Sequence, residues 1–235
     1  MKDISISIAI AVLMLAACNN KQQPVQEPTK PASTAAPAKK EPVLEPSNVM
    51  MEQHKVKDFA FWKSFFDSDD SVRKQNGLME PVVYRGIDDS NMVLVRFNIY
   101  ELAKARAFAE RLALKSITKK AGVTSLPAID FIKIIWTHQS TQNIKDRLLI
   151  SHHVKNFNEW LKAFNSEGKE KRASFGCVDR GFGRGVADSN MVFIAFSITD
   201  MAKEKTRISS TEFKKVMVNA GVDSKPKVVF FREAE

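Results

Sequence analysis

The segment His54–Trp62, HKVKDFAFW, decides the organisation of this chain, because it returns as His152–Trp160, HHVKNFNEW. The second copy lies 98 positions after the first, and further matches follow at a spacing of 98 or 99 positions. They are Arg85-Gly86 with Arg184-Gly185, DSNMV at 89–93 with DSNMV at 188–192, AGV at 121–123 with AGV at 220–222, and Pro127 with Pro226. A spacing this constant indicates an internal duplication. We call residues 49–137 repeat one, residues 148–235 repeat two, and residues 138–147 the linker.

The strand-like segments of repeat one are short and separated by turn or helix signals. We expect strands over residues 50–56, 82–86, 92–97 and 129–136, the middle two joined by a tight turn rich in Asp, Ser and Asn. Repeat two carries the same pattern, so both repeats receive the same interpretation.

Two helices complete each repeat. The first begins after a capping residue, Asp58 or Asn156, and shows one apolar face. That face consists of Phe59, Trp62, Phe65 and Phe66 in repeat one, and of Phe157, Trp160, Leu161 and Phe164 in repeat two. The second helix of repeat one covers residues 101–121 and ends at Gly122 in a C′ position. The order β-α-β-β-α-β predicts an α+β fold of the ferredoxin-like type.

A four-stranded sheet of this kind leaves one face without helices, and that face must be covered. Two tandem copies can place their open faces together within one chain. The alternative is two separate modules that each dimerise with another molecule. The short linker favours pairing within the chain, which predicts a monomer with an internal pseudo-dimer.

The repeated motifs also carry a resemblance. The pattern His-x-Val-x-Asp-Phe-x-x-Trp, then Arg-Gly-x-x-Asp-Ser-Asn, then Ala-Gly-Val and a Pro before the last strand, resembles antibiotic-biosynthesis-monooxygenase-like modules of the dimeric α/β-barrel superfamily. The resemblance covers nearly all of residues 49–235. It implies that two modules pair their sheets into one barrel around a ligand cavity, here within one chain.

The N-terminal segment has the features of an export signal. Residues 4–17 form an apolar run interrupted only by two serines, too short for a spanning helix but typical of a signal peptide. The run ends in LAAC at residues 15–18, which resembles the lipobox of bacterial lipoproteins. That resemblance implies cleavage before Cys18, acylation of Cys18, and a membrane-anchored protein of the cell envelope. Asn19-Asn20 in place of an Asp favours the outer membrane, facing the periplasm.

Residues 18–48 are predicted to be a tether. Residues 19–47 hold six of the nine prolines and no aromatic residue, so they bury too little apolar surface to fold. In an extended polyproline II conformation they reach roughly 90 Å at about 3.1 Å per residue.

Charge and cysteine content narrow the classes of function. The net charge is +9, but we find no basic stripe interleaved with aromatic residues and expect no nucleic-acid partner. Anionic lipid headgroups, envelope polymers or simple solubility account for the charge better. Once Cys18 is lipidated, Cys177 is the only thiol, so no intrachain disulfide forms. Cys177 takes the place of Leu78 and is expected to be a small buried hydrophobic residue.

Histidines at a repeated position are the first catalytic candidates. His54 and His152 end the first strand of each repeat and can face a common cavity, where imidazole suits proton transfer. The alternative is that each ring caps a local backbone group. The sequence shows no metal-ligand spacing, and we expect neither a metal nor a cofactor.

Repeated arginines are the ligand-binding candidates. Arg85 with Arg184, and Arg73 with Arg172, can hold an anionic ligand in the barrel or at its rim. The alternative is that these arginines support turns or form exposed ion pairs. The glycine-rich run 181–185 lacks the Lys-Ser/Thr of a phosphate-binding loop and is interpreted as a strand backbone slim enough for a close approach.

Three functions remain open. The first is a tethered barrel that binds a small, partly apolar ligand. The second is a protein-interaction or structural lipoprotein whose barrel is filled by side chains. The third is a monooxygenase- or isomerase-like enzyme that uses a barrel histidine. Both ligand hypotheses require a cavity of roughly a few hundred Å³.

Overall fold

The structure is a computed structural model that describes residues 48–112, 115–138 and 142–234. The predicted signal peptide and Cys18 lie outside the described residues. The elements of repeat one are β1 (Asn48–Lys55), α1 (Phe59–Ser68), α2 (Asp70–Gln75), β2 (Leu78–Gly86), β3 (Met92–Ile99), α3 (Leu102–Leu112), α4 (Lys115–Lys120) and β4 (Ala128–Thr137). The elements of repeat two are β5 (Asp146–His153), α5 (Phe157–Glu167), α6 (Lys169–Ser174), β6 (Cys177–Gly185), β7 (Met191–Ile198), α7 (Met201–Ser209), α8 (Thr211–Asn219) and β8 (Lys227–Glu233).

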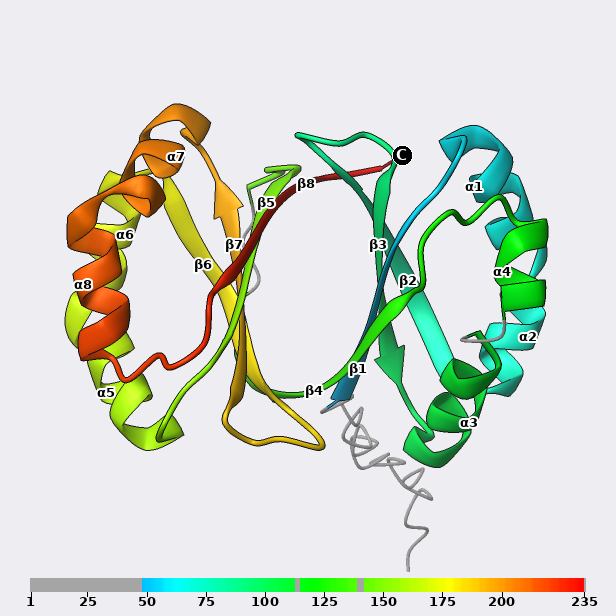
Figure 1. Cartoon of the computed structure of the whole chain (residues 1–235), viewed down its shortest axis with the longest axis horizontal. Helices are drawn as coiled ribbons and strands as arrows, with labels where there is room; N and C mark the ends of the chain where they lie inside the picture. Colours follow the sequence, from blue (N-terminus) through cyan, green and yellow to red (C-terminus); the bar gives the residue numbers. More distant parts are fainter. Residues whose placement is uncertain (1–47, 113–114, 139–141, 235) are drawn as a thin grey trace, which may run out of the picture. The chain divides into compact units, whose positions relative to one another are not determined.

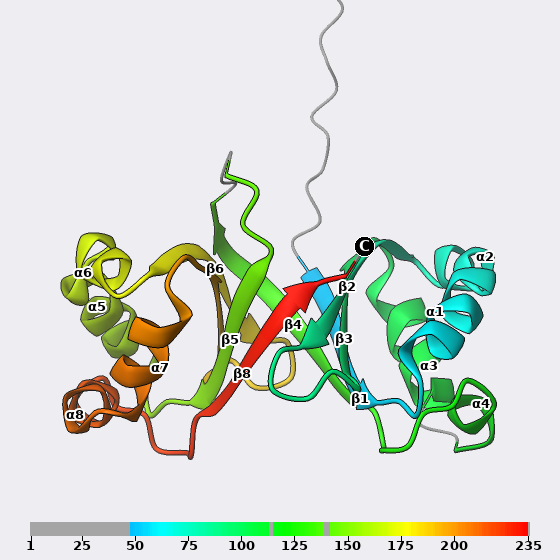
Figure 2. The same ribbon diagram turned by 90° about the horizontal axis from the view of Figure 1, so that it is seen from above.

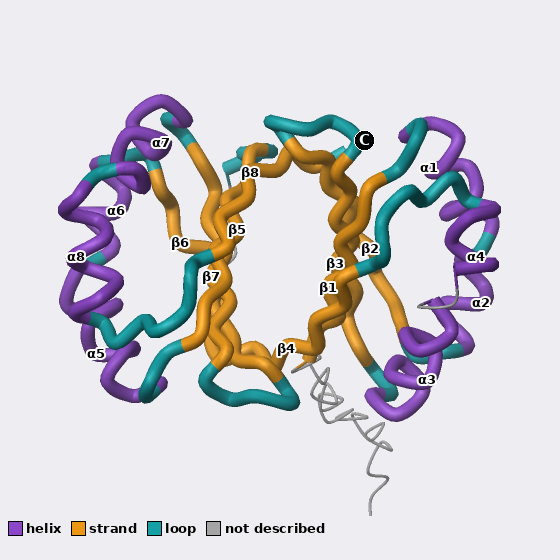
Figure 3. The backbone as a smooth tube through the Cα atoms, in the orientation of Figure 1, coloured by secondary structure: helices purple, strands orange, loops and turns teal. Residues whose placement is uncertain are grey.

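All eight strands close into one antiparallel barrel in the order β1-β3-β2-β8-β5-β7-β6-β4. Each repeat contributes four consecutive strands of that order, so the two open sheet faces meet inside one chain. Figures 1 and 3 show the ring of strands with the helices of each repeat outside it, on opposite sides. Figure 2 shows the same two helical layers from above. The predicted fold, two ferredoxin-like modules paired into an intrachain α/β barrel, is confirmed.

Two seams join the repeats. Strand β2 pairs with β8, and strand β4 pairs with β6. At the second seam, a Cβ atom added to Gly183 would lie 2.6 Å from the carbonyl oxygen of Lys133, and one added to Gly181 would lie 2.8 Å from that of Trp136. Any side chain at these positions would push the strands apart. The interpretation of the glycine-rich run as a slim backbone is therefore confirmed.

The first predicted helix of each repeat is divided into two shorter ones. In repeat one it breaks at Asp69, between α1 and α2, and in repeat two at Gly168, between α5 and α6. The predicted helix 101–121 contains α3 and α4, and residues 113–114 between them lie outside the described residues. The predicted caps are present: Asp58 accepts from the backbone N–H of Phe61 at 2.7 Å, and Asn156 accepts from that of Asn158 at 2.9 Å. Gly122 has φ +74°, the left-handed conformation expected after a helix.

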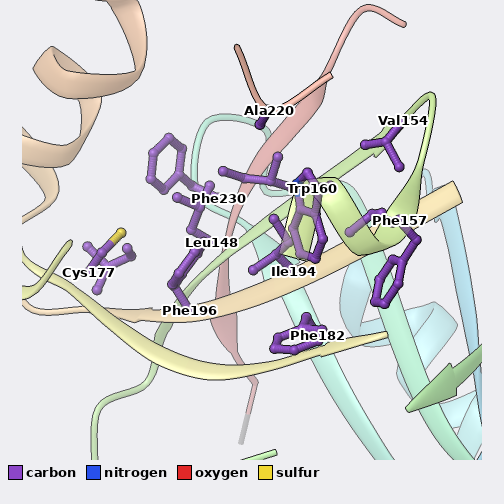
Figure 4. Packing of buried hydrophobic residues seen from close by; sticks show 13 residues of the cluster. Leu148, Val154, Phe157, Trp160, Cys177, Phe182, Ile194, Phe196, Ala220 and Phe230 are labelled. Atoms are coloured by element: carbon purple, nitrogen blue, oxygen red, sulfur yellow. The ribbon is translucent and has the colours of Figure 1, made fainter. Parts of the chain in front are cut away.

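Two apolar cores lie outside the barrel, each between its sheet and its own helices. Trp62 with Phe97 marks the core of repeat one, and Trp160 with Phe196 marks that of repeat two. Figure 4 shows the second core, where Trp160 lies among side chains from the strands of its own repeat. Cys177 belongs to this core and is fully buried, as predicted. Burial raises the pKa of its thiol, so the thiol is protonated at neutral pH.

Candidate functional site

The two repeated histidines do not share a cavity. Neighbouring side chains of a strand point to opposite faces, and Gln53 and Ser151 point into the barrel. His54 and His152 therefore point outward, each beneath its own helical layer. His54 packs against Trp62 with ring centroids 5.4 Å apart, and His152 packs against Trp160 at 6.1 Å. The expectation of one common cavity for the pair is wrong.

Beneath the helices of repeat two, however, there is a pocket beside His152. Strand β5 contributes Ile150 and His152 to it, helix α5 contributes Trp160, and helix α8 contributes Phe213 and Met217. The cavity volume is about 40 Å³, so in this closed state it has room for a very small group only. The residues that cover it from α8 are only partly buried, and no residue of α8 is fully buried.

The imidazole of His152 is the polar group of this pocket that lacks a partner. The residue is 1% exposed, and neither ring nitrogen has a hydrogen-bond partner among the described residues. Burial lowers the pKa of His152 from 6.5 to about 4. The ring is therefore neutral at pH 7 and presents one donor and one acceptor nitrogen. A buried polar group without a partner is uncommon in folded proteins and marks a place where a ligand can bind.

His54 has a different neighbour. The Oε1 atom of Glu52 lies 3.1 Å from Nδ1 of His54, without the orientation of a hydrogen bond. Repeat two has Ile150 where repeat one has Glu52. The same histidine therefore faces a carboxylate in one repeat and an apolar wall in the other.

A buried ionic network borders the pocket. Arg207 donates from Nε and Nη2 to the two carboxylate oxygens of Glu204, both at 2.7 Å. Arg172 donates to both oxygens of Asp179, at 2.8 and 2.6 Å. Glu167 lies 3.5 Å from each of the two arginines and joins the pairs. Although burial opposes it, hydrogen bonds and charge from these carboxylates raise the pKa of both arginines above its usual value.

Among the four predicted ligand-binding arginines, only Arg172 lines the pocket. The guanidinium of Arg85 lies 4.2 Å from the ring centroid of Phe59 and donates to the carbonyl of Ser90. Arg184 makes the equivalent contacts with the ring of Phe157 and the carbonyl of Ser189.

Arg73 is bound within its own repeat in a similar way. Its guanidinium stacks over the ring of Phe66 at 3.8 Å, donates to the carbonyl of Phe66, and lies 3.7 Å from Asp70. These contacts are those of arginines that support turns and helix ends. A role in ligand binding stays a prediction for all four.

The middle of the barrel is packed with side chains. One apolar cluster there consists of Val49, Ile132 and Phe193, and Phe231 of β8 is also fully buried. A space lined by Gln53, Ser151 and Phe193 has a volume of about 10 Å³, which is room for one water molecule. Neither this space nor the pocket of repeat two reaches the roughly few hundred Å³ that a pocket for a small ligand requires.

Two kinds of site are absent from the described residues. In these ranges no group of three or more His, Cys, Asp or Glu side chains is arranged to hold a metal ion. The helices of residues 48–112, 115–138 and 142–234 include none that is long and apolar enough to cross a membrane.

Known proteins are similar to this chain in structure only. No protein-family model matches the sequence, and no curated protein is significantly similar to it. An anthrone oxidase-like protein has a TM-score of 0.55 and 10% identity, covering 82% of this chain and 93% of its own. Two proteins provisionally assigned as monooxygenases have TM-scores of 0.51. The protein from Fusobacterium nucleatum is 12% identical, with 80% and 92% coverage, and the protein from Lactobacillus acidophilus is 11% identical, with 79% and 93% coverage.

These likenesses establish the fold. The structural neighbours are antibiotic-biosynthesis-monooxygenase-like proteins with the dimeric α/β-barrel fold, in agreement with the resemblance seen in the sequence. At 10 to 12% identity they carry no activity over to this chain.

Proposed function

We propose that this protein binds a small, partly apolar ligand in the pocket between the sheet and the helices of repeat two. The observation that carries the proposal is His152, a fully buried imidazole whose two nitrogens lack a partner, in a mostly aromatic and aliphatic pocket. The other polar residues of its lining, Glu167, Arg172 and Arg207, are paired with one another. Ligand pockets commonly combine apolar walls with very few polar groups that fix orientation. The monooxygenase-like neighbours are consistent with a ligand-binding barrel.

Binding requires helix α8 to move, because the closed pocket is small. The wall that α8 provides is suited to such movement. Its Val218 is 70% exposed, and Phe213 and Met217 are only partly buried where they face the pocket. Elements with few buried side chains open at the lowest free energy. An outward shift of α8 widens the pocket without breaking the barrel.

The proposed site of action is the cell envelope, with Cys18 acylated and residues 18–48 as the tether. Metabolic labelling with a palmitate analogue tests this part. We expect the label in the wild-type chain and none in Cys18→Ser, which should also leave the membrane fraction. Equal labelling of both chains would remove the anchor from the proposal.

Dense packing in the middle of the barrel favours a second candidate function, that of a protein-interaction or structural lipoprotein with a side-chain-filled barrel. The observation in its favour is the small size, about 10 Å³, of the space beside Gln53 and Ser151. Under this alternative no small molecule binds with saturation, and the pocket beside His152 is a packing defect.

The experiment that separates the two functions uses 1-naphthol, a flat apolar molecule with one hydroxyl group, titrated into the full chain while tryptophan fluorescence is followed. Trp62, Trp136 and Trp160 all contribute to this signal, and Trp160 lines the pocket. We expect saturable quenching of the fluorescence. His152→Phe should weaken the apparent affinity about tenfold, because about 1.4 kcal/mol is lost with one buried hydrogen bond. The matched variant His54→Phe, in the other repeat, should bind as the wild type does. Absence of saturation, or equal weakening in both variants, would exclude this pocket as the binding site.

A further inference from the structure

One end of the barrel interior contains a cluster of partly buried charged residues. Tyr84 on β2, Arg96 on β3, Arg147 on β5 and Glu233 on β8 point into the barrel by strand alternation, and Arg180 lies beside them at a bulge of β6. These side chains lie close enough to affect one another's pKa. Glu233, Arg147 and Arg96 act on the pKa of Tyr84. Arg147, Tyr84 and Glu233 act on that of Arg180. Both repeats contribute, so this cluster exists only because the barrel closes.

Arg147 and Arg96 use their donors within the fold, whereas Arg180 does not. Nη2 of Arg147 donates to Oε2 of Glu233 at 3.2 Å, and its Nη1 donates to the carbonyl of Asp146 at 3.2 Å and to that of Ile144. Nη2 of Arg96 donates to Oδ1 of Asn98 at 2.7 Å. Asn98 in turn donates to the carboxylate of Glu80. The guanidinium of Arg180 makes no hydrogen bond or ion pair with any residue that the structure describes, although the residue is partly buried.

The charges do not balance either. Three guanidinium groups face two carboxylates, those of Glu80 and Glu233, which leaves a positive excess in a partly dehydrated space. Burial lowers the pKa of Arg96 and that of Arg180, and the neighbouring Arg147 lowers the pKa of Arg180 further. Bringing an anion into this space would offset both effects.

The fold itself does not require this charge. The positions of repeat two that correspond to Tyr84 and Arg96 are Gly183 and Ala195, and the position of repeat one that corresponds to Arg147 is Val49. The related half of the interior is therefore apolar or small, and the barrel closes there equally well. Partly buried arginines that packing does not demand point to a ligand.

We propose that this cluster is a binding site for a phosphate group. Guanidinium groups recognise oxyanions through paired N–H donors. The three arginines come from three different strands, so their donors approach from several directions. A tetrahedral phosphate has oxygens in all of those directions, whereas a carboxylate has two oxygens in one plane. The phosphate belongs either to a free small molecule or to a lipid headgroup.

The test is thermal unfolding of the full chain in a nonionic detergent, with sodium phosphate compared with sodium chloride at equal ionic strength. We expect a saturable rise in the unfolding temperature with phosphate alone. In Arg180→Gln the apparent Kd should rise at least tenfold, while the fold is kept, because Arg180 makes no contact that the fold depends on. Arg111→Gln, an equal loss of charge on the exposed side of α3, should behave as the wild type does.

Two further ligands identify the source of the phosphate group and the chemical class of the ligand. Saturable binding of glycerophosphoglycerol as well as phosphate supports a lipid headgroup, and binding of phosphate alone supports a free small molecule. Acetate that binds as tightly as phosphate would contradict the phosphate class. Equal stabilisation by phosphate and chloride, or an unchanged Kd in Arg180→Gln, would overturn the site.

Discussion

Beneath the helices of repeat one, the side chains of α3 that face the sheet include Ala105 and Phe108, whereas repeat two has Glu204 and Arg207 at the corresponding positions of α7. Both pairs are largely buried between the same kinds of element. One repeat therefore fills the layer with apolar groups and the other with an ion pair. The pocket beside His152 lies next to that ion pair. The difference teaches that the duplicated fold accommodates either an apolar pair or an ion pair in this layer.

Removal of Glu204 should have the largest effect on stability. Glu204→Ala leaves Arg207 buried with only Glu167 near it, at 3.5 Å. Breaking a buried ion pair typically costs about 3–5 kcal/mol of unfolding free energy. Urea unfolding measures this loss.

The comparison of the repeats supplies the control. The double variant Glu204→Ala with Arg207→Phe copies repeat one, and we expect it to recover most of the loss because apolar replacements of buried ion pairs are often neutral. If the double variant is as unstable as the single one, the two layers are not interchangeable.

Gly183 tests the seam between the repeats, where repeat one has Tyr84 at the corresponding position. Gly183→Ala places a Cβ atom 2.6 Å from the carbonyl oxygen of Lys133, which forces β4 and β6 apart. Overpacking of this kind costs about 1–3 kcal/mol. We expect Gly181→Ala, with a nearest approach of 2.8 Å, to be destabilising in the same direction. Unchanged urea midpoints in both variants would show that β4 and β6 accommodate the added Cβ atom without loss of stability.

The low pKa of His152 predicts that the free energy of unfolding depends on pH, and this dependence arises from a residue of repeat two. Its folded pKa of about 4 lies below the ordinary 6.5, so the unfolded chain takes up the proton first as the pH falls. Stability is therefore lost between about pH 6.5 and about pH 4. At pH 5 the loss relative to pH 7 is about 2 kcal/mol for this group.

Urea unfolding at pH 7 and pH 5 checks this, with variants to isolate the residue from other titrating groups. His152→Phe should reduce the pH dependence by about 2 kcal/mol, and His54→Phe should keep it because His152 is intact. The same pH dependence in His152→Phe and the wild type would mean that the ring of His152 is protonated in the folded chain without loss of unfolding free energy.

The smallest effect is expected at the repeated arginines of the turns. Arg184→Gln and Arg85→Gln each remove one stacking contact and one hydrogen bond to a turn carbonyl, worth about 1 kcal/mol together. Both variants should bind 1-naphthol as the wild type does, as measured by tryptophan fluorescence. Weaker binding in Arg184→Gln would restore this arginine as a ligand-binding residue.

Residues that occur at equivalent positions of both repeats reveal the fold more readily than they reveal the sites. Arg85 and Arg184 recur because both copies need the same turn, and His54 and His152 recur because both copies keep the same strand end. Repetition did find His152, but the candidate sites also depend on residues without a counterpart, such as Arg207 beside the pocket and Arg180 in the charged cluster. A usable signal existed in the sequence: Glu204 and Arg207 place opposite charges three residues apart, where repeat one has Ala105 and Phe108.

The sequence alone determined the duplication, the order of the elements, their caps, and the slim backbone of run 181–185. These features follow from local chemistry, namely apolar periodicity, capping side chains and glycines, and each is visible within a few residues. The tertiary structure decided which face each strand residue occupies. Strand β1 is buried on both faces, against helices on one side and the opposite sheet on the other, so alternation cannot tell inside from outside. Only barrel closure directed His152 toward the helices and brought Arg96, Arg147 and Arg180 together from three strands.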